Sequence, residues 1–511
     1  MYQALLTRRY LTSKVMPLLS MAAVLLSVAT VLITWSVMGG FLEVLLGSGR
    51  KLIGDVAITW PNVGFKHADD LVDRLEEHPG IDRAAPVVET FGLIQLPDAQ
   101  VREVFIKGIE PESFGAVTDL PASLWWRPIE EPTRRDTARL DPRLPENTAP
   151  DFMAWTLNNG LSMTRPDDRT GEPKPAAILG ITVSGMNRRT EGGVYEPLAV
   201  IRPEASGDVA FEDVFMPRNG EIAITVLALD SGGRPIDSVT RSFPVANEFQ
   251  SGIYDADSKT VLVPLEGLQK MLRMDEARRL VQRESFDPLD PASSAGELVT
   301  DPERVTTVLV RGAPGTDARA VQAIARDVYA EFAGAHPGEV PDALSVNIQT
   351  WEDLNATLIG AVKKETGLVL FVFGIVCFTT VFLVLSIFWS MVSEKTKDIG
   401  ILRSLGASTA GIAWLWLRYG FAIGVVGTAC GLVSGYLIVT NINAIHEWLG
   451  TTFGLVIWDA RVYYFTDIPR VVEPWRAVVV GIAGVMTCVV GAAIPALRAA
   501  RMDPVKALRF E

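Results

Sequence analysis

Cysteine and histidine are scarce in this 511-residue chain, which has three of the first and four of the second. The three cysteines, Cys377, Cys430 and Cys488, all lie in long apolar runs. The rest of the chain therefore has no thiols for disulfides or for a cysteine-ligated metal. It has to be stabilised by a buried apolar core of its own.

Several sequence motifs of catalysis are also missing. Glycine is never followed by lysine, so the chain has no Walker-type phosphate-binding loop. Neither HExxH nor GxSxG occurs, and no two acidic residues stand out as an acid–base pair. His78 and His336 each precede a Pro-Gly pair at the end of a predicted helix, where the helix dipole explains a histidine better than a metal does. We predict no catalytic residue, no bound cofactor and no metal on this chain.

Charge is absent from four long runs, at residues 15–42, 366–393, 419–446 and 477–497. About 20 apolar residues are enough for a helix to cross a bilayer, so each run can span one. The first run is nearly twice as long as the apolar core of a signal peptide, which has about 7–15 residues. We therefore predict an uncleaved anchor followed by three further spans.

Basic residues orient these spans, because cytoplasmic segments carry an excess of lysine and arginine. An inside N-terminus places these basic residues in the cytoplasm: Arg8, Arg9, Lys14, Lys395, Lys397, Arg403, Arg498, Arg501, Lys506 and Arg509. Removing the +3 of residues 1–42 and the +4 of residues 363–511 from the net charge of −13 leaves −20 on residues 43–362. Such an acidic outer block argues against binding of nucleic acid or anionic lipid.

The predicted fold is an integral membrane α-helical protein with four transmembrane helices and a large α+β domain inserted between helices 1 and 2. The predicted segments are a cytoplasmic tail (1–14), transmembrane helices (15–42, 363–392, 412–440, 476–496), the outer domain (43–362), a cytoplasmic coupling helix (393–411), an outer loop (441–475) and a cytoplasmic tail (497–511).

Strand–helix–strand patterns stand at both ends of the outer domain and predict a split α+β module. Between them lie a Pro-rich loop (121–175) and a β-rich insertion with a hairpin about Ser231-Gly232-Gly233. We expect the Pro-rich loop to pack on its own domain, although it could also clasp a partner. Residues 351–365 are predicted as a stalk helix that runs straight into the second span.

A short charged island separates the second and third spans. Ile399, Leu402 and Leu405 recur at a spacing of three and predict one apolar stripe on a helix, and Gly406 follows as a helix stop. Charged residues surround the stripe, namely Glu394, Lys395, Asp398 and Arg403. A short amphipathic helix at one membrane face suits the docking of a cytosolic partner.

Glycines recur at spacings of three and four along the third span, at Gly420, Gly424, Gly427, Gly431 and Gly435. They share one helix face, and small residues allow membrane helices to approach closely. The sequence leaves two alternatives open, which are packing within the chain and a seam against a second chain.

Taken together, these features resemble the FtsX-like ABC transporter permeases. The island EKTKDIGILRSLGAS is similar to the coupling-helix motif of the lipoprotein-releasing branch, which is related to macrolide-export permeases. The tail RAARMDPVKALRFE and the outer stretches FPVANEFQSGIYDADSKTVLVPLEGLQKML and RVYYFTDIP also resemble that family.

The resemblance implies a non-catalytic permease subunit in the bacterial inner membrane, with its large domain in the periplasm. Its partners would be cytoplasmic ABC ATPase subunits, which hold ATP and magnesium, and a second permease chain, either identical or a paralogue. The residues that match the coupling helix would contact the ATPase: Glu394, Lys395, Asp398, Ile399, Leu402, Arg403, Leu405 and Gly406. The implied activity is mechanotransmission that releases lipoproteins or other amphiphiles from the membrane. Efflux of drugs or peptides, and control of a periplasmic cell-wall hydrolase, remain alternatives.

Overall fold

The chain folds into two compact units. The computed structural model describes residues 15–48, 52–128, 155–167, 170–189, 195–203, 209–230, 233–281, 297–455 and 468–508. The helical unit comprises residues 1–45, 357–459 and 467–511, and the mixed unit comprises residues 46–356 and 460–466.

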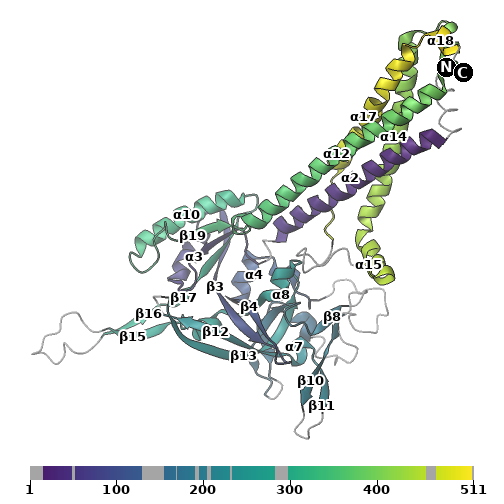
Figure 1. Ribbon diagram of the computed structural model, residues 1–511. Helices are drawn as coiled ribbons and strands as arrows, with labels where there is room; N and C mark the ends of the chain where they lie inside the picture. Colours follow the sequence, from purple (N-terminus) through teal and green to yellow (C-terminus); the bar gives the residue numbers. More distant parts are fainter. Residues whose placement is uncertain are drawn as a thin grey trace, which may run out of the picture. The chain divides into compact units, whose positions relative to one another are not determined.

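Four helices of the helical unit are long and apolar enough to cross a membrane, judged by length and composition. They are α2 (Val15–Ser48), α12 (Ala356–Glu394), α14 (Thr409–Thr440) and α17 (Pro474–Ala500) (Figure 1). Each covers the corresponding predicted span and extends beyond it at one end or at both. The hydropathy pattern therefore located four long apolar helices, and these helices continue into flanking residues where backbone hydrogen bonding still favours a helix.

Three shorter helices of this unit lie in the part of the chain that the structure describes. The charged island forms α13 (Thr396–Ser404), and α18 (Pro504–Leu508) packs against it. The predicted outer loop contains α15 (Ile442–Phe453), which the sequence analysis did not predict. A buried core joins the long helices through Val384 and Phe388 of α12, Ile423 of α14 and Cys488 of α17.

The mixed unit is built on a sheet in which strands from the two ends of the domain alternate. The order β3-β18-β1-β19 is antiparallel throughout. These strands are β1 (Val56–Thr59), β3 (Ile81–Gln95), β18 (Thr307–Gly312) and β19 (Asn347–Thr350). The helix α3 (Ala68–Glu76) lies between β1 and β3, and α10 (Ala318–Ala335) connects β18 to β19. The two strand–helix–strand segments thus interleave into one split module, and neither can complete the sheet alone.

Beyond β18, the long strand β3 takes part in a closed ring. It pairs with β4 on one side and with β12 on the other. The ring runs β12-β13-β7-β14-β4-β3, and the β12–β3 pairing closes these strands into a barrel. The further strands are β4 (Val101–Ile109), β7 (Ala177–Gly180), β12 (Glu221–Leu229), β13 (Pro235–Phe249) and β14 (Thr260–Pro264). The strands β12 and β13 are the hairpin predicted about Ser231-Gly232-Gly233.

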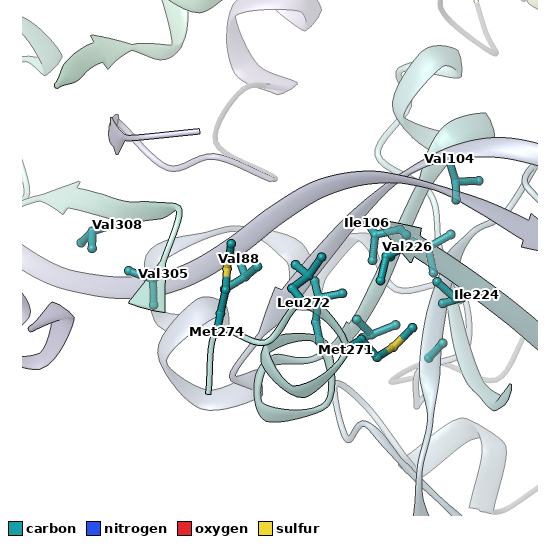
Figure 2. Close-up of a cluster of buried hydrophobic side chains, with 14 of the residues drawn as sticks. Val88, Val104, Ile106, Ile224, Val226, Met271, Leu272, Met274, Val305 and Val308 are labelled. Atoms are coloured by element: carbon teal, nitrogen blue, oxygen red, sulfur yellow. The ribbon is translucent and has the colours of Figure 1, made fainter. Parts of the chain in front are cut away.

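One apolar core connects the barrel with the split module. Figure 2 shows Val104 and Ile106 of β4 beside Ile224 and Val226 of β12, with side chains of α9 (Leu265–Leu272) close to them. Burial alternates along β12, because successive side chains of a strand point to opposite faces. This apolar core stabilises the mixed unit without disulfides, which the positions of the cysteines exclude.

Shorter elements occupy the loops of the mixed unit. The helices are α4 (Pro111–Val117), α5 (Leu120–Ser123), α7 (Met216–Asn219), α8 (Tyr254–Lys259) and α11 (Trp351–Leu354). The strands are β2 (Phe65–Lys66), β5 (Thr164–Pro166), β6 (Pro173–Pro175), β8 (Asn187–Arg189), β9 (Tyr195–Pro197), β10 (Ala199–Pro203), β11 (Val209–Asp213), β15 (Ala277–Val281), β16 (Glu297–Asp301) and β17 (Arg304–Val305).

The Pro-rich segment packs on its own domain where the structure describes it. Trp126 is fully buried, packs edge-on against Phe215 at 5.2 Å between ring centroids, and donates its indole N–H to Glu248 at 3.1 Å. Residues 129–154 of this segment lie outside the described residues. Its described beginning therefore belongs to the core, as the first of the two alternatives predicted.

The stalk helix is not continuous, contrary to the prediction. The helix α11 ends at Leu354, and α12 begins at Ala356, with Asn355 between them. The side-chain amide of Asn355 donates to the Trp351 carbonyl oxygen at 3.2 Å, which satisfies the end of α11 locally. The periodicity of apolar residues continues across Asn355, and for that reason it could not show the break.

Asp353 holds this end of the mixed unit together. It completes a capping box with Thr350 at the start of α11. Its carboxylate also accepts two hydrogen bonds from the Arg319 guanidinium on α10, at 3.0 and 2.8 Å. Burial alone raises the pKa of Asp353, but the hydrogen bonds from Thr350 and Arg319 outweigh it and leave the pKa below its ordinary value.

We predict that Asp353→Asn lowers the stability of the protein at neutral pH, because the charged pair with Arg319 is lost. A carboxylate whose pKa is depressed by folding stabilises above its unfolded pKa, and this stability is lost as the pH falls through the folded pKa. The difference in melting temperature between wild type and Asp353→Asn should therefore shrink as the pH falls below the ordinary pKa of an aspartate. Thermal unfolding from pH 7 to pH 3 measures it, with Glu352→Gln as the neighbouring control. A difference that is independent of pH would contradict this role.

Candidate functional site

The charged island between α12 and α14 is a short helix with defined ends. The helix α13 stops in a Schellman arrangement, in which the Gly406 N–H donates to the Arg403 carbonyl and the Ala407 N–H donates to the Leu402 carbonyl. Gly406 adopts φ 97°, in the left-handed region that favours glycine. Ser408 then accepts from the Gly411 N–H and starts α14. The predicted helix stop is thus present, and the helix is shorter than the expected 393–411.

The charged residues of the island play different parts. Lys395 pairs with Asp398 one turn further on, at 2.8 Å. Arg403 donates from Nη1 to the Ala500 carbonyl at 3.1 Å, at the C-terminal end of α17. A cation is favourable there, because the last carbonyl groups of a helix carry partial negative charge. Arg403 therefore connects α13 to α17. Glu394, by contrast, is exposed to solvent.

The predicted apolar stripe is divided between the inside and the outside of the protein. Ile399 is only 3% exposed and belongs to the core of the helical unit, so its side chain is not available to a partner. Leu402 is half-buried, whereas Leu405 is 79% and Ile401 is 48% exposed. The exposed surface of the island, here called the α13 surface, consists of Ile401, Leu402 and Leu405 with the charged residues around them.

A second cation stands near this end of the bundle. The Arg498 guanidinium lies 3.9 Å from the centroid of the Trp389 ring, so that α17 contacts α12 through a cation–π interaction. The helix α18 adds an exposed apolar side chain, Val505, next to α13 in the fold. Contacts between neighbouring helices therefore hold α13 in place, while the apolar side chains of the α13 surface remain exposed to solvent.

We predict that Arg403→Met loosens α13 without unfolding the bundle. A hydrogen bond to a charged group contributes about 1.5 kcal/mol, so local opening should increase about tenfold. Hydrogen exchange of the backbone amides of residues 396–405 measures this effect in the full-length protein. Lys397→Met, which removes an exposed charge from the same helix, is the control. Equal exchange in both variants would show that the contact with Ala500 does not hold the helix.

The five glycines of α14 lie at helix contacts within the chain. A Cβ on Gly420 would be 2.7 Å from the Ala492 Cβ, and one on Gly424 would be 3.0 Å from the Cys488 Cβ, both on α17. Gly427, Gly431 and Gly435 face α2 in the same way, at 3.1, 2.9 and 3.1 Å from its nearest atoms. Of the two alternatives that the sequence left open, the structure shows packing within the chain.

We predict that Gly431→Ala destabilises the helical unit. The added methyl would lie 2.9 Å from the Leu25 carbonyl oxygen, a backbone atom that cannot move without shifting α2. Overpacking of this kind costs roughly 1–3 kcal/mol. Thermal unfolding of the detergent-solubilised chain measures it, and Gly374→Ala is the matched control, because nothing lies within 4 Å of its added Cβ. A melting temperature for Gly431→Ala equal to that of the control would contradict the close approach.

With four candidate spans and a mixed α/β unit inserted after the first, the chain has the organisation of a polytopic membrane protein. Residues 370–504, which include α13 and most of α12, match the family model of the FtsX-like permease C-terminal region. This match confirms the resemblance that the sequence motifs indicated. This stretch is therefore similar to the C-terminal region of the FtsX-like permeases.

Similar proteins include lipoprotein-releasing system transmembrane proteins. LolC of Xylella fastidiosa is 25% identical over 291 residues, which cover 57% of this chain and 60% of that protein. LolE of Haemophilus influenzae is 28% identical over 137 residues, covering 27% of this chain and 32% of that protein. The chain therefore spans less than two thirds of the length of these relatives.

Among solved structures, the periplasmic region of MacB from Actinobacillus actinomycetemcomitans covers 62% of this chain and 97% of that region, with 9% identity and a TM-score of 0.26. A similarity of that degree supports no argument about the mixed unit. The sheet topology of the mixed unit is therefore established by its strand pairings alone.

Proposed function

We propose that this protein is the permease subunit of an ABC transporter that works by mechanotransmission from a separate cytoplasmic ATPase. Its activity is the release of lipoproteins or other amphiphiles from the outer leaflet of the bacterial inner membrane. Both termini and the α13 surface face the cytoplasm, and the mixed unit lies in the periplasm. ATP and magnesium are held by the partner ATPase, and two permease chains assemble in one complex.

The α13 surface is the observation that carries this proposal. It presents Leu405 and Ile401 to solvent at the end of a capped helix, while Arg403 and Ile399 fasten the same helix to the bundle. A docking element needs both properties, since exposed apolar side chains bind the partner and rigid attachment passes the motion on. The matching of this region to the FtsX-like permease C-terminal family supports the same role.

The choice of cargo rests on the relatives and on the outer face of the barrel. The relatives LolC and LolE are described as parts of lipoprotein-releasing systems. Exposed apolar side chains occur on neighbouring strands of the barrel, at Phe91 and Leu93 of β3, Val101 of β4 and Leu227 of β12. These exposed apolar side chains are available to contact the acyl chain of a lipoprotein.

We predict that Leu405→Asp separates the permease from its ATPase. Placing a carboxylate in the centre of an apolar contact costs roughly 2 kcal/mol, or about thirtyfold in Kd. The tagged full-length chain is isolated from its native membrane, and the ABC ATPase subunit that co-purifies is measured by mass spectrometry. Leu344→Asp, at a fully exposed position of the mixed unit, is the control. If wild type brings down no ABC ATPase, the proposed function is wrong. If Leu405→Asp retains it fully, the docking role of Leu405 is wrong.

Photo-crosslinking distinguishes the possible cargoes. A photoreactive amino acid at Phe91 should form adducts with lipoproteins in intact cells, and the same residue at Leu344 should not. Adducts with a periplasmic hydrolase would instead indicate a signalling permease. Drug-sized or peptide adducts would indicate efflux.

A further inference from the structure

Two short His-x-x-acid segments meet in the mixed unit. The first is His67 with Asp70, at the start of α3, and the second is His336 with Glu339, just after α10. The segments are far apart in the sequence, since Asp70 and His336 are 266 residues apart. They come together because the interleaved strands place α3 and α10 in contact.

The side chains are arranged in a crossed manner. The His67 and His336 rings are stacked, with 4.3 Å between centroids and 12° between planes. Each ring contacts the acidic residue of the other segment: His67 Nε2 lies 2.6 Å from Glu339 Oε2, and His336 Nε2 lies 2.9 Å from Asp70 Oδ2. One ligand atom from each of His67, His336 and Glu339 lies within 4.8 Å of the other two.

We propose that His67, His336 and Glu339 bind a divalent transition-metal ion, with zinc as the best fit. Two imidazole nitrogens and one carboxylate oxygen are a ligand set that zinc uses in sites that keep a fourth position open. In a tetrahedral zinc site with bonds of about 2.1 Å, the ligand atoms are about 3.4 Å apart. Small side-chain rotations are enough to bring the three atoms to that spacing, because all three side chains are partly exposed.

The helix dipole accounts for only one of these histidines. His336 is the C-cap of α10, where a histidine is favourable, but His67 is the N-cap of α3, where a cationic side chain is not. His67 also adopts φ 59°, a left-handed conformation that is uncommon for residues other than glycine. Its ring faces Glu339 and the His336 ring, an arrangement that suits a neutral metal ligand.

The charge around the site favours a cation. Two acidic side chains, Glu339 and Asp70, lie beside the two imidazole rings. Asp70 keeps its pair with Arg74, at 2.9 Å, when His336 turns towards the metal.

A metal here would join the two ends of the outer domain. The ligands come from the first strand–helix–strand segment and from the second, so the ion would link α3 to the turn after α10. Its binding to the folded protein alone would raise stability by mass action. This inference is independent of the proposed transport activity.

The test uses the full-length chain in detergent, purified with a tag that lacks histidine and stripped of metal with a chelator. Zinc binding is then titrated by competition with a chromophoric chelator. We expect one high-affinity zinc per chain in wild type, and an affinity at least 100-fold lower in His336→Gln and in Glu339→Gln. His78→Gln is the matched control, because the chain has only four histidines and His78 lies in the same unit, outside the cluster.

Thermal unfolding provides a second measurement. Zinc should raise the melting temperature of wild type and of His78→Gln, and should leave that of Glu339→Gln unchanged. Glutamine at position 339 preserves the shape of the side chain and a hydrogen bond to His67, so the metal-free variant should unfold at nearly the wild-type temperature. No stoichiometric zinc in wild type, or equal binding by all variants, would overturn the proposal. The cluster would then be two imidazole–carboxylate pairs only.

Discussion

The close approach that glycine allows along α14 is the constraint on which the helical unit depends. One face of this helix has hydrogen in place of five side chains, so α17 and α2 can approach its backbone to van der Waals distance. In a membrane, where lipid offers apolar contacts as good as those of protein, packing of this kind has to supply the attraction between helices. The positions of α12 and α13 follow, because both pack on the bundle that α14 holds together.

The charged island shows how one short helix can be fixed to the helix bundle and still expose apolar side chains to solvent. Ile399 enters the core, and Arg403 binds the end of α17, whereas Leu405 and Ile401 remain in solvent. The fixed residues limit how far α13 can move independently of the bundle. Leu405 is therefore exposed on a helix whose residues Ile399 and Arg403 are fixed to the bundle. The mixed unit has a comparable fixed point at Asp353, where α10 and α11 meet.

Predictions from the sequence succeeded where a strong physical requirement acts on each residue separately. A bilayer requires about 20 apolar residues in each span, so the four runs predicted α2, α12, α14 and α17. A left-handed helix end favours glycine, so Gly406 predicted the end of α13. The periodicity at Ile399, Leu402 and Leu405 predicted a stripe, but could not show that its first residue is buried in the core of the helical unit. The break at Asn355 was missed because the spacing of apolar residues does not change there.

Residue type and spacing along one segment were enough to predict the four long apolar helices, the charge of residues 43–362 and the amphipathic character of the island. Contacts between residues far apart in the chain appeared only in the folded structure. The closing of the barrel by β12 and β3, and the crossing of His67 and His336 with Glu339 and Asp70, depend on strand pairings between distant segments. Such pairings leave no local pattern, because their energy arises only when the whole sheet forms.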